Sequence, residues 1–428
     1  MSSLSPDAVL DDLRARGLIH DHTDLDALRA RLAEGPITLY AGFDPTADSL
    51  HVGHLVPLLV LRRFQLHGHH PIALAGGATG MIGDPSGRSE ERNLLDDETL
   101  TRNVAAISAQ LAGFLDFGEG PARARLVDNR DWIAPMGVIE FLRDVGKHVT
   151  VNVMLAKESV RARVESEHGI SYTEFSYMLL QALDFRWLHE HHGCELQVGG
   201  SDQWGNITAG IDLIRRSSGA HVHGLTVPLV TRADGAKFGK TASGAVWLDP
   251  ARTSPYAFYQ YFVNVDDRDV ERFLLQLTLL PVERVATIMD DHRRAPEQRV
   301  AQRALAFEVT ALVHGGDAAE EARAASSGFT RAAATLAPEE FETLADSIPT
   351  TRLTAEQFER TDLVELAATV GLAGSRSEAR RLLDQHGLYV NDEAQLENRP
   401  LRAGDLVHGR WVLLRRGKRQ RHLLVVEG

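Results

Sequence analysis

From residue 44 to residue 54 the chain reads Asp44-Pro45-Thr46-Ala47-Asp48-Ser49-Leu50-His51-Val52-Gly53-His54. An apolar, strand-like run at residues 37–42 precedes this stretch, and a helix-like run at residues 55–66 follows it. A strand, a tight turn and a helix in this order point backbone N–H groups at an anion. The two histidines add donors for a phosphate, and Gly53 leaves room for a flat ring against the backbone. Taken alone, the pattern fits a turn with two surface histidines equally well.

Three more strand-like runs, at residues 70–75, 195–198 and 225–231, each lead into a loop with polar side chains. Because the carboxyl ends of parallel strands meet at one edge of a sheet, we expect these loops to gather beside residues 44–54. The side chains brought together would be Asp44, Thr46, His51, His54, Asp84, Arg88, Asp202, Gln203, Lys237, Lys240 and Thr241. Such a site would hold anion donors beside acidic groups suited to ribose hydroxyls or an amine.

No Ser-His-Asp or Cys-His order accompanies these loops. This favours a reaction in which the substrate is its own nucleophile, while the protein positions it and stabilises charge on transferring phosphate oxygens. A further helix is predicted from Ser171, which opens a capping box, to about residue 191, with Gly193 as its stop. Its residues Tyr177, Gln181 and Asp184 fall on one face.

Composition indicates a globular protein of several domains. The chain has 428 residues, of which 43% are hydrophobic and 25% charged. The single cysteine, Cys194, excludes an internal disulfide framework and any multi-cysteine zinc site. No apolar run approaches the roughly 20 residues of a membrane span, and residues 1–14 lack an apolar targeting segment. We therefore expect a cytoplasmic enzyme without membrane association.

The expected fold class is α/β: a Rossmann-like parallel-sheet catalytic domain, a helical domain and a small α+β domain. The predicted boundaries are 1–248 for the catalytic domain with its helical lead-in, 249–328 for the helical domain, 329–350 for a linker and 351–428 for the last domain. The formal net charge of −13 argues against general coating of nucleic acid, DNA included. Residues 401–421, however, carry seven Lys or Arg against one Asp, beside a capped basic helix at 375–383, which favours RNA binding.

The loop motifs resemble those of a known family. His51-Val52-Gly53-His54 is similar to the HIGH signature of class I aminoacyl-tRNA synthetases, and Lys237-Phe238-Gly239-Lys240-Thr241 to the KMSKS loop in the variant of bacterial tyrosyl-tRNA synthetases. Further matches to that family follow in order: Tyr40, residues 42–46, 83–87 and 200–206. The resemblance is close over residues 40–261 and looser in the C-terminal part, which resembles a small RNA-binding domain shared with a ribosomal protein.

The resemblance implies that tyrosine attacks the α-phosphate of ATP, releasing pyrophosphate, and that the tyrosyl group then moves to the terminal ribose of tRNA(Tyr). It assigns Tyr40 and Asp184 to the phenol of L-tyrosine. It assigns the rest of the tyrosine to Asp84, Tyr177 and Gln181 for the amino group, Gln203 near the carboxylate, and Asn129. It assigns the adenylate to Gly42, Asp44, Gly53 and Asp202. It assigns the departing pyrophosphate and its transition state to Thr46, His51, Arg88, Arg92, Lys237, Lys240 and Thr241. It places His54, also counted as catalytic, against the nucleotide beside Gly53.

The same resemblance implies Mg²⁺ with the nucleotide, no permanently bound metal or organic cofactor, and a homodimer for which residues 136–154 could form the interface. Two alternatives stay open: the same class of enzyme acting on tryptophan, and a non-catalytic RNA-binding protein on a synthetase scaffold. A metal site at His189, His191, His192 and Cys194 is disfavoured, because consecutive positions point apart and histidines suit a helix C-terminus.

Overall fold

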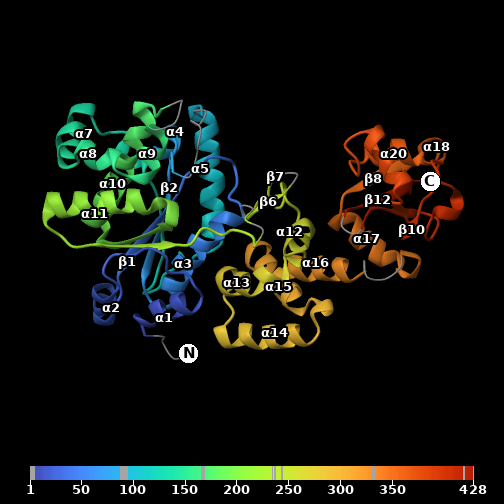
Figure 1. Cartoon of the computed structure of the whole chain (residues 1–428), viewed down its shortest axis with the longest axis horizontal. Helices are drawn as coiled ribbons and strands as arrows, with labels where there is room; N and C mark the ends of the chain where they lie inside the picture. The colour runs from blue at the N-terminus through green and yellow to red at the C-terminus, as the bar shows by residue number, and fades with distance from the viewer. Residues whose placement is uncertain are drawn as a thin grey trace. The chain divides into compact units, whose positions relative to one another are not determined.

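The computed structural model describes residues 5–86, 95–164, 169–233, 235, 238–241, 244–328, 333–417 and 420–427. Of residues 158, 159, 162, 240, 241, 327, 328, 343, 346 and 347 it describes only the backbone. The chain forms two compact units (Figure 1). The first consists of Met1–Asp249 and Val265–Leu305, and the second of Pro250–Asn264 and Ala306–Gly428. Each unit has its own sheet, and we describe the two units separately.

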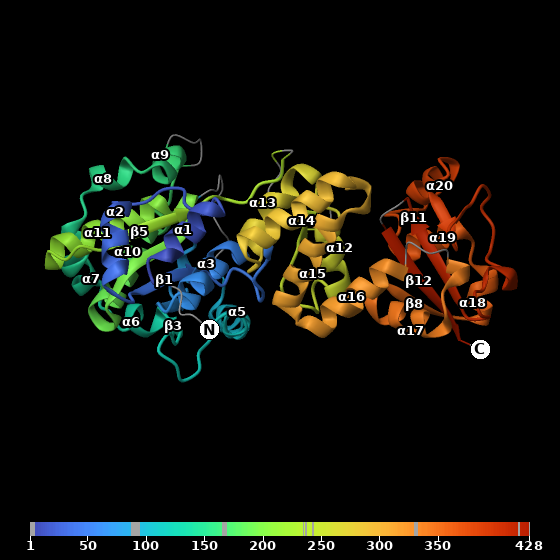
Figure 2. The same ribbon diagram turned by 90° about the horizontal axis from the view of Figure 1, so that it is seen from below.

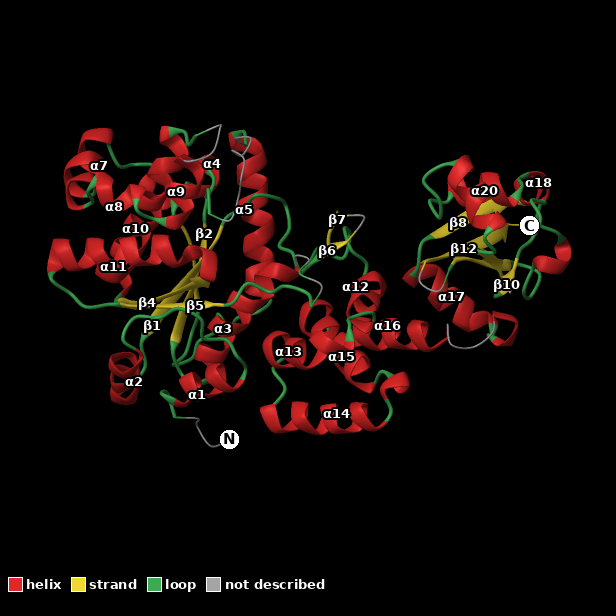
Figure 3. Ribbon diagram, in the orientation of Figure 1, coloured by secondary structure: helices red, strands yellow, loops and turns green. Residues whose placement is uncertain are grey.

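The first unit is built on a five-stranded sheet, yellow in Figure 3. Its strands are β1 (Thr38–Phe43), β2 (His70–Ala75), β3 (Arg125–Asp128), β4 (Cys194–Gly200) and β5 (His223–Val227). They lie in the order β3-β2-β1-β4-β5, and all neighbouring strands are parallel. The α/β class and the parallel arrangement of the expected strands are therefore confirmed, and all their carboxyl ends meet at one edge.

Helices cover both faces of this sheet. α3 (Leu55–Leu66) and α5 (Asp97–Ala112) lie on one face, and α10 (Tyr172–His192) and α11 (Trp204–Ser218) on the other (Figure 1 and Figure 2). Nearly all of α3 is buried, as its run of leucines and valines requires. α10 begins where predicted, because the Ser171 hydroxyl accepts a hydrogen bond from the Glu174 N–H, and it ends at Gly193, whose φ is +60°.

The remaining helices of the first unit are shorter or peripheral. They are α1 (Ala8–Ala15), α2 (Leu25–Glu34), α4 (Thr79–Ile82), α6 (Arg130–Ile133), α7 (Val138–Asp144), α8 (Val151–Leu155), α9 (Glu158–Val164), α13 (Asp267–Leu277) and α14 (Val282–Arg294). A small hairpin, β6 (Lys240–Thr241) with β7 (Gly244–Ala245), follows β5. None of the helices in the described ranges is long and apolar enough to cross a membrane.

The second unit has a sheet of order β10-β9-β11-β12-β8, antiparallel except for the β12–β8 pair. Its strands are β8 (Thr350–Thr354), β9 (Leu388–Val390), β10 (Glu393–Ala394), β11 (Trp411–Arg416) and β12 (Gln420–Glu427). Its helices are α12 (Pro255–Val263), α16 (Gly316–Gly328), α17 (Pro338–Ser347), α18 (Ala355–Arg360), α19 (Leu363–Thr369) and α20 (Arg376–Asp384), and α15 (Val300–His314) spans the division between the units.

The segment predicted as a linker, residues 329–350, is in its described part not a linker. It contains α17, whose Phe341 and Leu344 are buried in one cluster with Trp411 and Leu413 of the sheet. The rings of Phe341 and Trp411 stack with their centroids 5.2 Å apart. The spacing of Phe341, Leu344 and Ile348 is that of a helix face, which the Ala-, Glu- and Thr-rich composition obscured.

The helical segment 249–328 also differs from the expected single domain. α13 and α14 belong to the first unit, whereas α12 and α16 belong to the second, where they pack together. Hydrophobic periodicity predicted that this segment is helical, but it carries no information on which hydrophobic core each helix packs against.

Candidate active site

A cavity of about 770 Å³ lies at the carboxyl edge of the first sheet. Its walls come from the ends of β1, β4 and β5, from the following loops and from one face of α10. The cavity brings together thirteen of the residues singled out from sequence. They are Tyr40, Gly42, Asp44, Thr46, His51, Gly53, His54, Asp84, Tyr177, Gln181, Asp184, Asp202 and Gln203.

Asp44, which lines the cavity, accepts hydrogen bonds from two hydroxyl groups. Its Oδ1 accepts a hydrogen bond from the Thr79 hydroxyl at 2.8 Å, and its Oδ2 accepts one from the Tyr177 hydroxyl at 2.7 Å. Glycine is required at position 76, since a Cβ there would lie 2.2 Å from Asp44 Oδ1. The Tyr177 oxygen keeps lone pairs that can accept from a donor in the cavity.

Asp184 has a buried carboxyl group with a hydrogen-bond donor on each oxygen. Trp132 Nε1 donates to Oδ1 at 2.9 Å, and Asn129 Nδ2 donates to Oδ2 at 3.0 Å. Burial raises the pKa of Asp184 to about 8 against the opposing effect of these two hydrogen bonds. Asn129 itself is fully buried and is not among the cavity-lining residues, so it lies behind Asp184 rather than at the substrate position predicted for it.

The hydroxyl of Tyr40 shares this end of the cavity with Asp184. Tyr40 is 1% exposed, and its hydroxyl has no hydrogen-bond partner among the described residues. Burial, followed by the charge of Asp184, raises the pKa of Tyr40 well above its usual value, so the two groups lie within electrostatic reach. A buried hydroxyl without a partner costs free energy, which a polar group entering the cavity could recover.

Gln197 is a second buried group without its full complement of partners at this end. It stands opposite Tyr40 in the β1–β4 register, lines the cavity and is 2% exposed. Its amide oxygen has no partner within the described ranges. Sequence reasoning missed Gln197, although a glutamine inside an otherwise apolar strand was a signal that could have indicated a functional position.

Amide side chains that include Gln203 form a hydrogen-bond network beside Asp84. Gln203 Nε2 donates to Asp84 Oδ2 at 2.6 Å, and Asn206 Nδ2 donates to Gln181 Oε1 at 3.0 Å. Burial raises the pKa of Asp202, and the charge of Asp84 raises it further. Several carboxylates so close together repel one another, and a bound cationic group would relieve that repulsion.

His51 and His54 present neutral donors to the cavity. Their rings stack with centroids 4.0 Å apart. The Gly53 N–H donates to His51 Nδ1, and the His51 N–H donates to His54 Nδ1, both at 3.1 Å. Because both Nδ1 atoms accept, each neutral ring carries its proton on Nε2. Burial, followed by the electrostatic effect of the adjacent His51 ring, holds the pKa of His54 well below its usual value.

The space beside Gly53 is already occupied. A Cβ at this position would lie 2.8 Å from His51 Cε1, so the glycine is needed for the His51 ring. Gly53 also lines the cavity, and the packing of a flat ligand ring against its backbone stays a prediction. The 3₁₀ turn Val52–His54 leads directly into α3, so the motif sits at the start of that helix.

The loop that contains Gly239 is attached to the histidine motif by backbone hydrogen bonds. Val246 N–H donates to the Gly239 carbonyl at 2.9 Å, and Val52 N–H donates to the Val246 carbonyl at 3.0 Å. Gly239 has a φ of +78°, and a Cβ there would lie 2.5 Å from Val52 Cγ2. The buried ring of Phe238 packs on Phe273 with the centroids 4.6 Å apart.

Several predicted site residues cannot be assessed in the structure. Arg88, Arg92 and Lys237 lie outside the described residues, as do the side chains of Lys240 and Thr241. The backbone of the last two forms β6, directly after Gly239. Sequence reasoning missed Thr79 and Trp132, which donate hydrogen bonds to Asp44 and Asp184, because neither belongs to a recognisable motif.

The disfavoured metal cluster near the end of α10 has other partners. His189 Nδ1 and His191 Nδ1 are hydrogen-bonded to the carbonyl oxygens of Cys194 and Trp187, each at 2.9 Å. Among the residues with described placement, no group of three His, Cys, Asp or Glu side chains could hold a metal ion. Burial raises the pKa of the Cys194 thiol, which keeps it in the protonated form.

Comparison with known proteins places this geometry in a family. Residues 32–330 match the family model described as tRNA synthetases class I (W and Y), and residues 340–424 match that of a Tyrosine--tRNA ligase SYY-like C-terminal domain. The Tyrosine--tRNA ligase of Opitutus terrae is 57% identical over 96% of this chain and 98% of its own length. That of Geobacillus stearothermophilus is 50% identical over 97% and 99%.

Solved structures of synthetases are similar to the first part of this chain. A truncated mitochondrial tyrosyl-tRNA synthetase from Aspergillus nidulans is 35% identical and superposes with a TM-score of 0.69, covering 75% of this chain and 93% of that one. A tryptophanyl-tRNA synthetase from Encephalitozoon cuniculi has a TM-score of 0.54 at 13% identity, over 78% of this chain and 89% of that chain, which reports a shared fold alone.

Proposed function

The chain belongs to the class I tyrosyl-tRNA synthetases, and on this premise we propose how its cavity carries out their reaction. In the first step a carboxylate oxygen of tyrosine attacks the α-phosphorus of ATP. The bond from that phosphorus to the bridging oxygen breaks, and pyrophosphate leaves. In the second step a hydroxyl of the terminal ribose of tRNA attacks the tyrosyl carbonyl, and AMP leaves.

The observation that carries the assignment of the tyrosine end is the buried Tyr40 hydroxyl without a partner beside Asp184. A phenol placed between them can donate to Asp184 and accept from Tyr40. Phenylalanine would fill the same volume but leave the Tyr40 hydroxyl unpaired and bring no donor to Asp184. The loss of such a contact discriminates strongly between substrates, and the preference of this family for tyrosine over phenylalanine is the standard example. Indole offers one donor and no acceptor, so it satisfies Asp184 but not Tyr40.

We assign the α-amino group of tyrosine to Asp84, Tyr177 and Gln181. The Tyr177 oxygen can accept from an ammonium because its own proton is donated to Asp44. Asp84 supplies a charge, and the ammonium would offset the repulsion that raises the pKa of Asp202. Gln203, bonded to Asp84, is then placed near the tyrosine carboxylate.

We assign the nucleotide to the opposite end of the cavity, with Gly42, Asp44, Gly53 and Asp202 around the adenylate. We assign the phosphates to hydrogen-bond and charged donors, whose interactions become strongest as negative charge develops on the departing pyrophosphate. These donors are Thr46, His51, His54, Arg88, Arg92, Lys237, Lys240 and Thr241. The two histidines suit this role because their Nε2 protons are present without a positive charge on the ring. Mg²⁺ would be bound by the phosphate oxygens of ATP and would arrive with the nucleotide. We propose that the enzyme has no permanently bound cofactor.

A homodimer is supported by exposed apolar side chains on α7 and α8. Val138 and Ile139 are 74% and 76% exposed, and Leu142 and Val151 are 47% and 58% exposed. Such a patch on a soluble chain is typical of an interaction surface. The patch falls within residues 136–154, the range predicted for the dimer interface. We also place the enzyme in the cytoplasm, where its tRNA is used.

Contact with tRNA by the second unit is supported by α20. Arg376, Arg380 and Arg381 are exposed on this helix. Arg376 pairs with Glu365, whereas Arg380 and Arg381 form no ion pair within the described residues. The basic excess of residues 401–421 is partly neutralised, since Arg410 pairs with Glu342 at 2.9 Å and Arg416 with Glu378 at 2.8 Å. α20 is therefore a better candidate for the phosphate backbone than the tail alone.

The deciding experiment is ATP–pyrophosphate exchange with tyrosine, phenylalanine or tryptophan as the amino acid. We expect exchange with tyrosine alone. Exchange with tryptophan instead would overturn the assignment of the phenol site. Binding of structured RNA without exchange for any amino acid would favour the non-catalytic RNA-binding alternative.

A further inference from the structure

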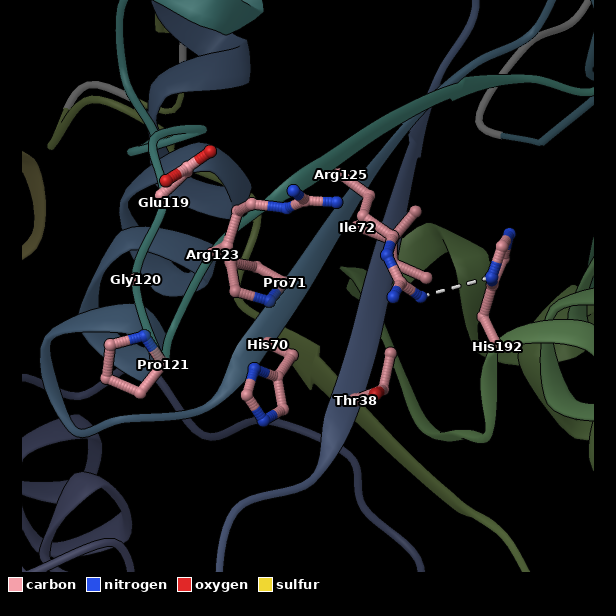
Figure 4. Close-up of a pocket in the computed structure, with 10 residues that line it drawn as sticks. All are labelled: Thr38, His70, Pro71, Ile72, Glu119, Gly120, Pro121, Arg123, Arg125 and His192. Carbon is pink, nitrogen blue, oxygen red and sulfur yellow. Dashed lines mark hydrogen bonds between the residues drawn. The ribbon is translucent and has the colours of Figure 1, made fainter.

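A second cavity, of about 480 Å³, opens at the amino edge of the first sheet, the edge opposite the one that holds the active site. Figure 4 shows the side chains that line it. Thr38, His70 and Arg125 are the first residues of β1, β2 and β3, and His192 is the last residue of α10. Arg123 comes from the loop before β3. Three stretches of chain thus bring basic side chains to this cavity: β2, residues 123–125 and the end of α10.

The charges in this cavity are not balanced within the protein. In the described part of the chain neither Arg123 nor Arg125 forms an ion pair, and the only acidic residue that lines the cavity is the exposed Glu119. Arg125 Nη1 instead donates to His192 Nδ1 at 3.1 Å, the dashed line in Figure 4. Two guanidinium groups that pair with no carboxylate among the described residues stand out in a chain whose net charge is −13.

The pKa values of the two histidines that line the cavity, His70 and His192, reflect their burial and the positive charge beside them. The pKa values of His70 and His192 are both lowered, first by burial and then by the charge of Arg125. Because His192 Nδ1 accepts from Arg125, the neutral ring carries its proton on Nε2, as a further donor. The cavity therefore offers several N–H donors and a net positive field.

We propose that this cavity binds a small phosphate-type oxyanion, with Arg123 and Arg125 as its main ligands and His70 and His192 as supporting donors. Guanidinium groups match the oxygens of a phosphate in pairs, and they hold their charge at any physiological pH. The site is separate from the active-site cavity, since the two share none of their lining residues. The inference goes beyond the proposed function and does not depend on it.

A tryptophan beside the cavity provides a readout. The ring of Trp187 stacks on His191 at 4.3 Å and meets the edge of His192 at 5.4 Å between centroids. Its other face stacks on Trp132 at 4.1 Å. An anion in the cavity would favour the protonated form of His192, and a protonated imidazole against an indole changes its fluorescence. Trp187 should therefore report binding without any measurement of activity.

The test is a titration of the whole chain with inorganic phosphate, and separately with pyrophosphate, followed by tryptophan fluorescence and by calorimetry. Sodium chloride at matched ionic strength serves as the blank. Arg125→Gln removes the charge of an exposed residue and should preserve the fold, which thermal unfolding can check. Arg102→Gln is the matched control, because Arg102 is an exposed arginine of α5 outside the cavity.

We expect a saturable fluorescence change that Trp187→Phe abolishes. Binding should weaken tenfold or more in Arg125→Gln and stay within twofold of wild type in Arg102→Gln. Phosphate that binds only in the active site would leave calorimetry unchanged in Arg125→Gln, and this result would overturn the proposal. So would a change that the chloride blank reproduces. Saturation with pyrophosphate but not phosphate would identify the ligand as a diphosphate.

Discussion

Removal of the Tyr40 hydroxyl should stabilise the empty protein and weaken its handling of tyrosine. This hydroxyl is buried, and the described residues offer it no partner. A buried polar group left unpaired costs about 1–3 kcal/mol, so Tyr40→Phe should raise the free energy of unfolding by about 1 kcal/mol. In the complex the same substitution loses a neutral hydrogen bond worth about 0.5–1.5 kcal/mol, which lowers kcat/KM for tyrosine by about 2- to 10-fold.

Tyr177→Phe is the matched control, since it makes the same chemical change in the same cavity. Tyr177 is also buried, at 4% exposure, but its hydroxyl donates to Asp44 at 2.7 Å. A hydrogen bond to a charged group contributes about 1.5–3 kcal/mol, so this variant should lose stability of that order. The two substitutions are thus expected to shift stability in opposite directions.

The assay compares urea unfolding midpoints of the two variants without ligand, together with ATP–pyrophosphate exchange for tyrosine and phenylalanine. Tyr40→Phe should narrow the preference for tyrosine because only the tyrosine reaction loses a contact. A Tyr40→Phe protein destabilised by as much as Tyr177→Phe would refute the reasoning. It would mean that the Tyr40 hydroxyl is already satisfied in the empty cavity.

Three further outcomes are expected. Asp184 keeps its proton to about pH 8 in the folded state but loses it near pH 4 in the unfolded state, so the free energy of unfolding of the wild type falls as pH rises between these values. The asparagine in the Asp184→Asn variant does not titrate, so the urea midpoint of this variant should rise relative to that of the wild type as pH rises. A difference in midpoint that stays constant with pH would contradict the raised pKa. Gly239→Ala forces a Cβ within 2.5 Å of Val52 Cγ2 at a φ of +78°, and should slow tyrosine activation in single-turnover kinetics with little change in tyrosine affinity. Lys240→Ala should likewise lower the activation rate far more than tyrosine affinity, and equal losses in both would remove Lys240 from the transition state.

Much of the catalytic unit could be predicted from sequence because its signals are local. β2 was predicted at its observed bounds, and α10 begins and ends at the predicted Ser171 cap and Gly193 stop. Parallel strands then require their loops to meet at one edge, so the residues of the cavity followed from order along the chain. The second unit was harder, since the helix face of α17 was hidden in a segment of linker-like composition.

The sequence by itself determined which residue types reach the cavity and which family the chain resembles. Tertiary structure alone decided how those residues are hydrogen-bonded, buried and protonated in the empty cavity. Asp44 and Tyr177 are 133 positions apart, yet their hydrogen bond occupies the proton of one and an oxygen of the other. Asp184 has a pKa near 8 and Tyr40 an unpaired hydroxyl among the described residues because of what surrounds them. Burial and pairing arise from segments distant in the chain, and no local pattern encodes them.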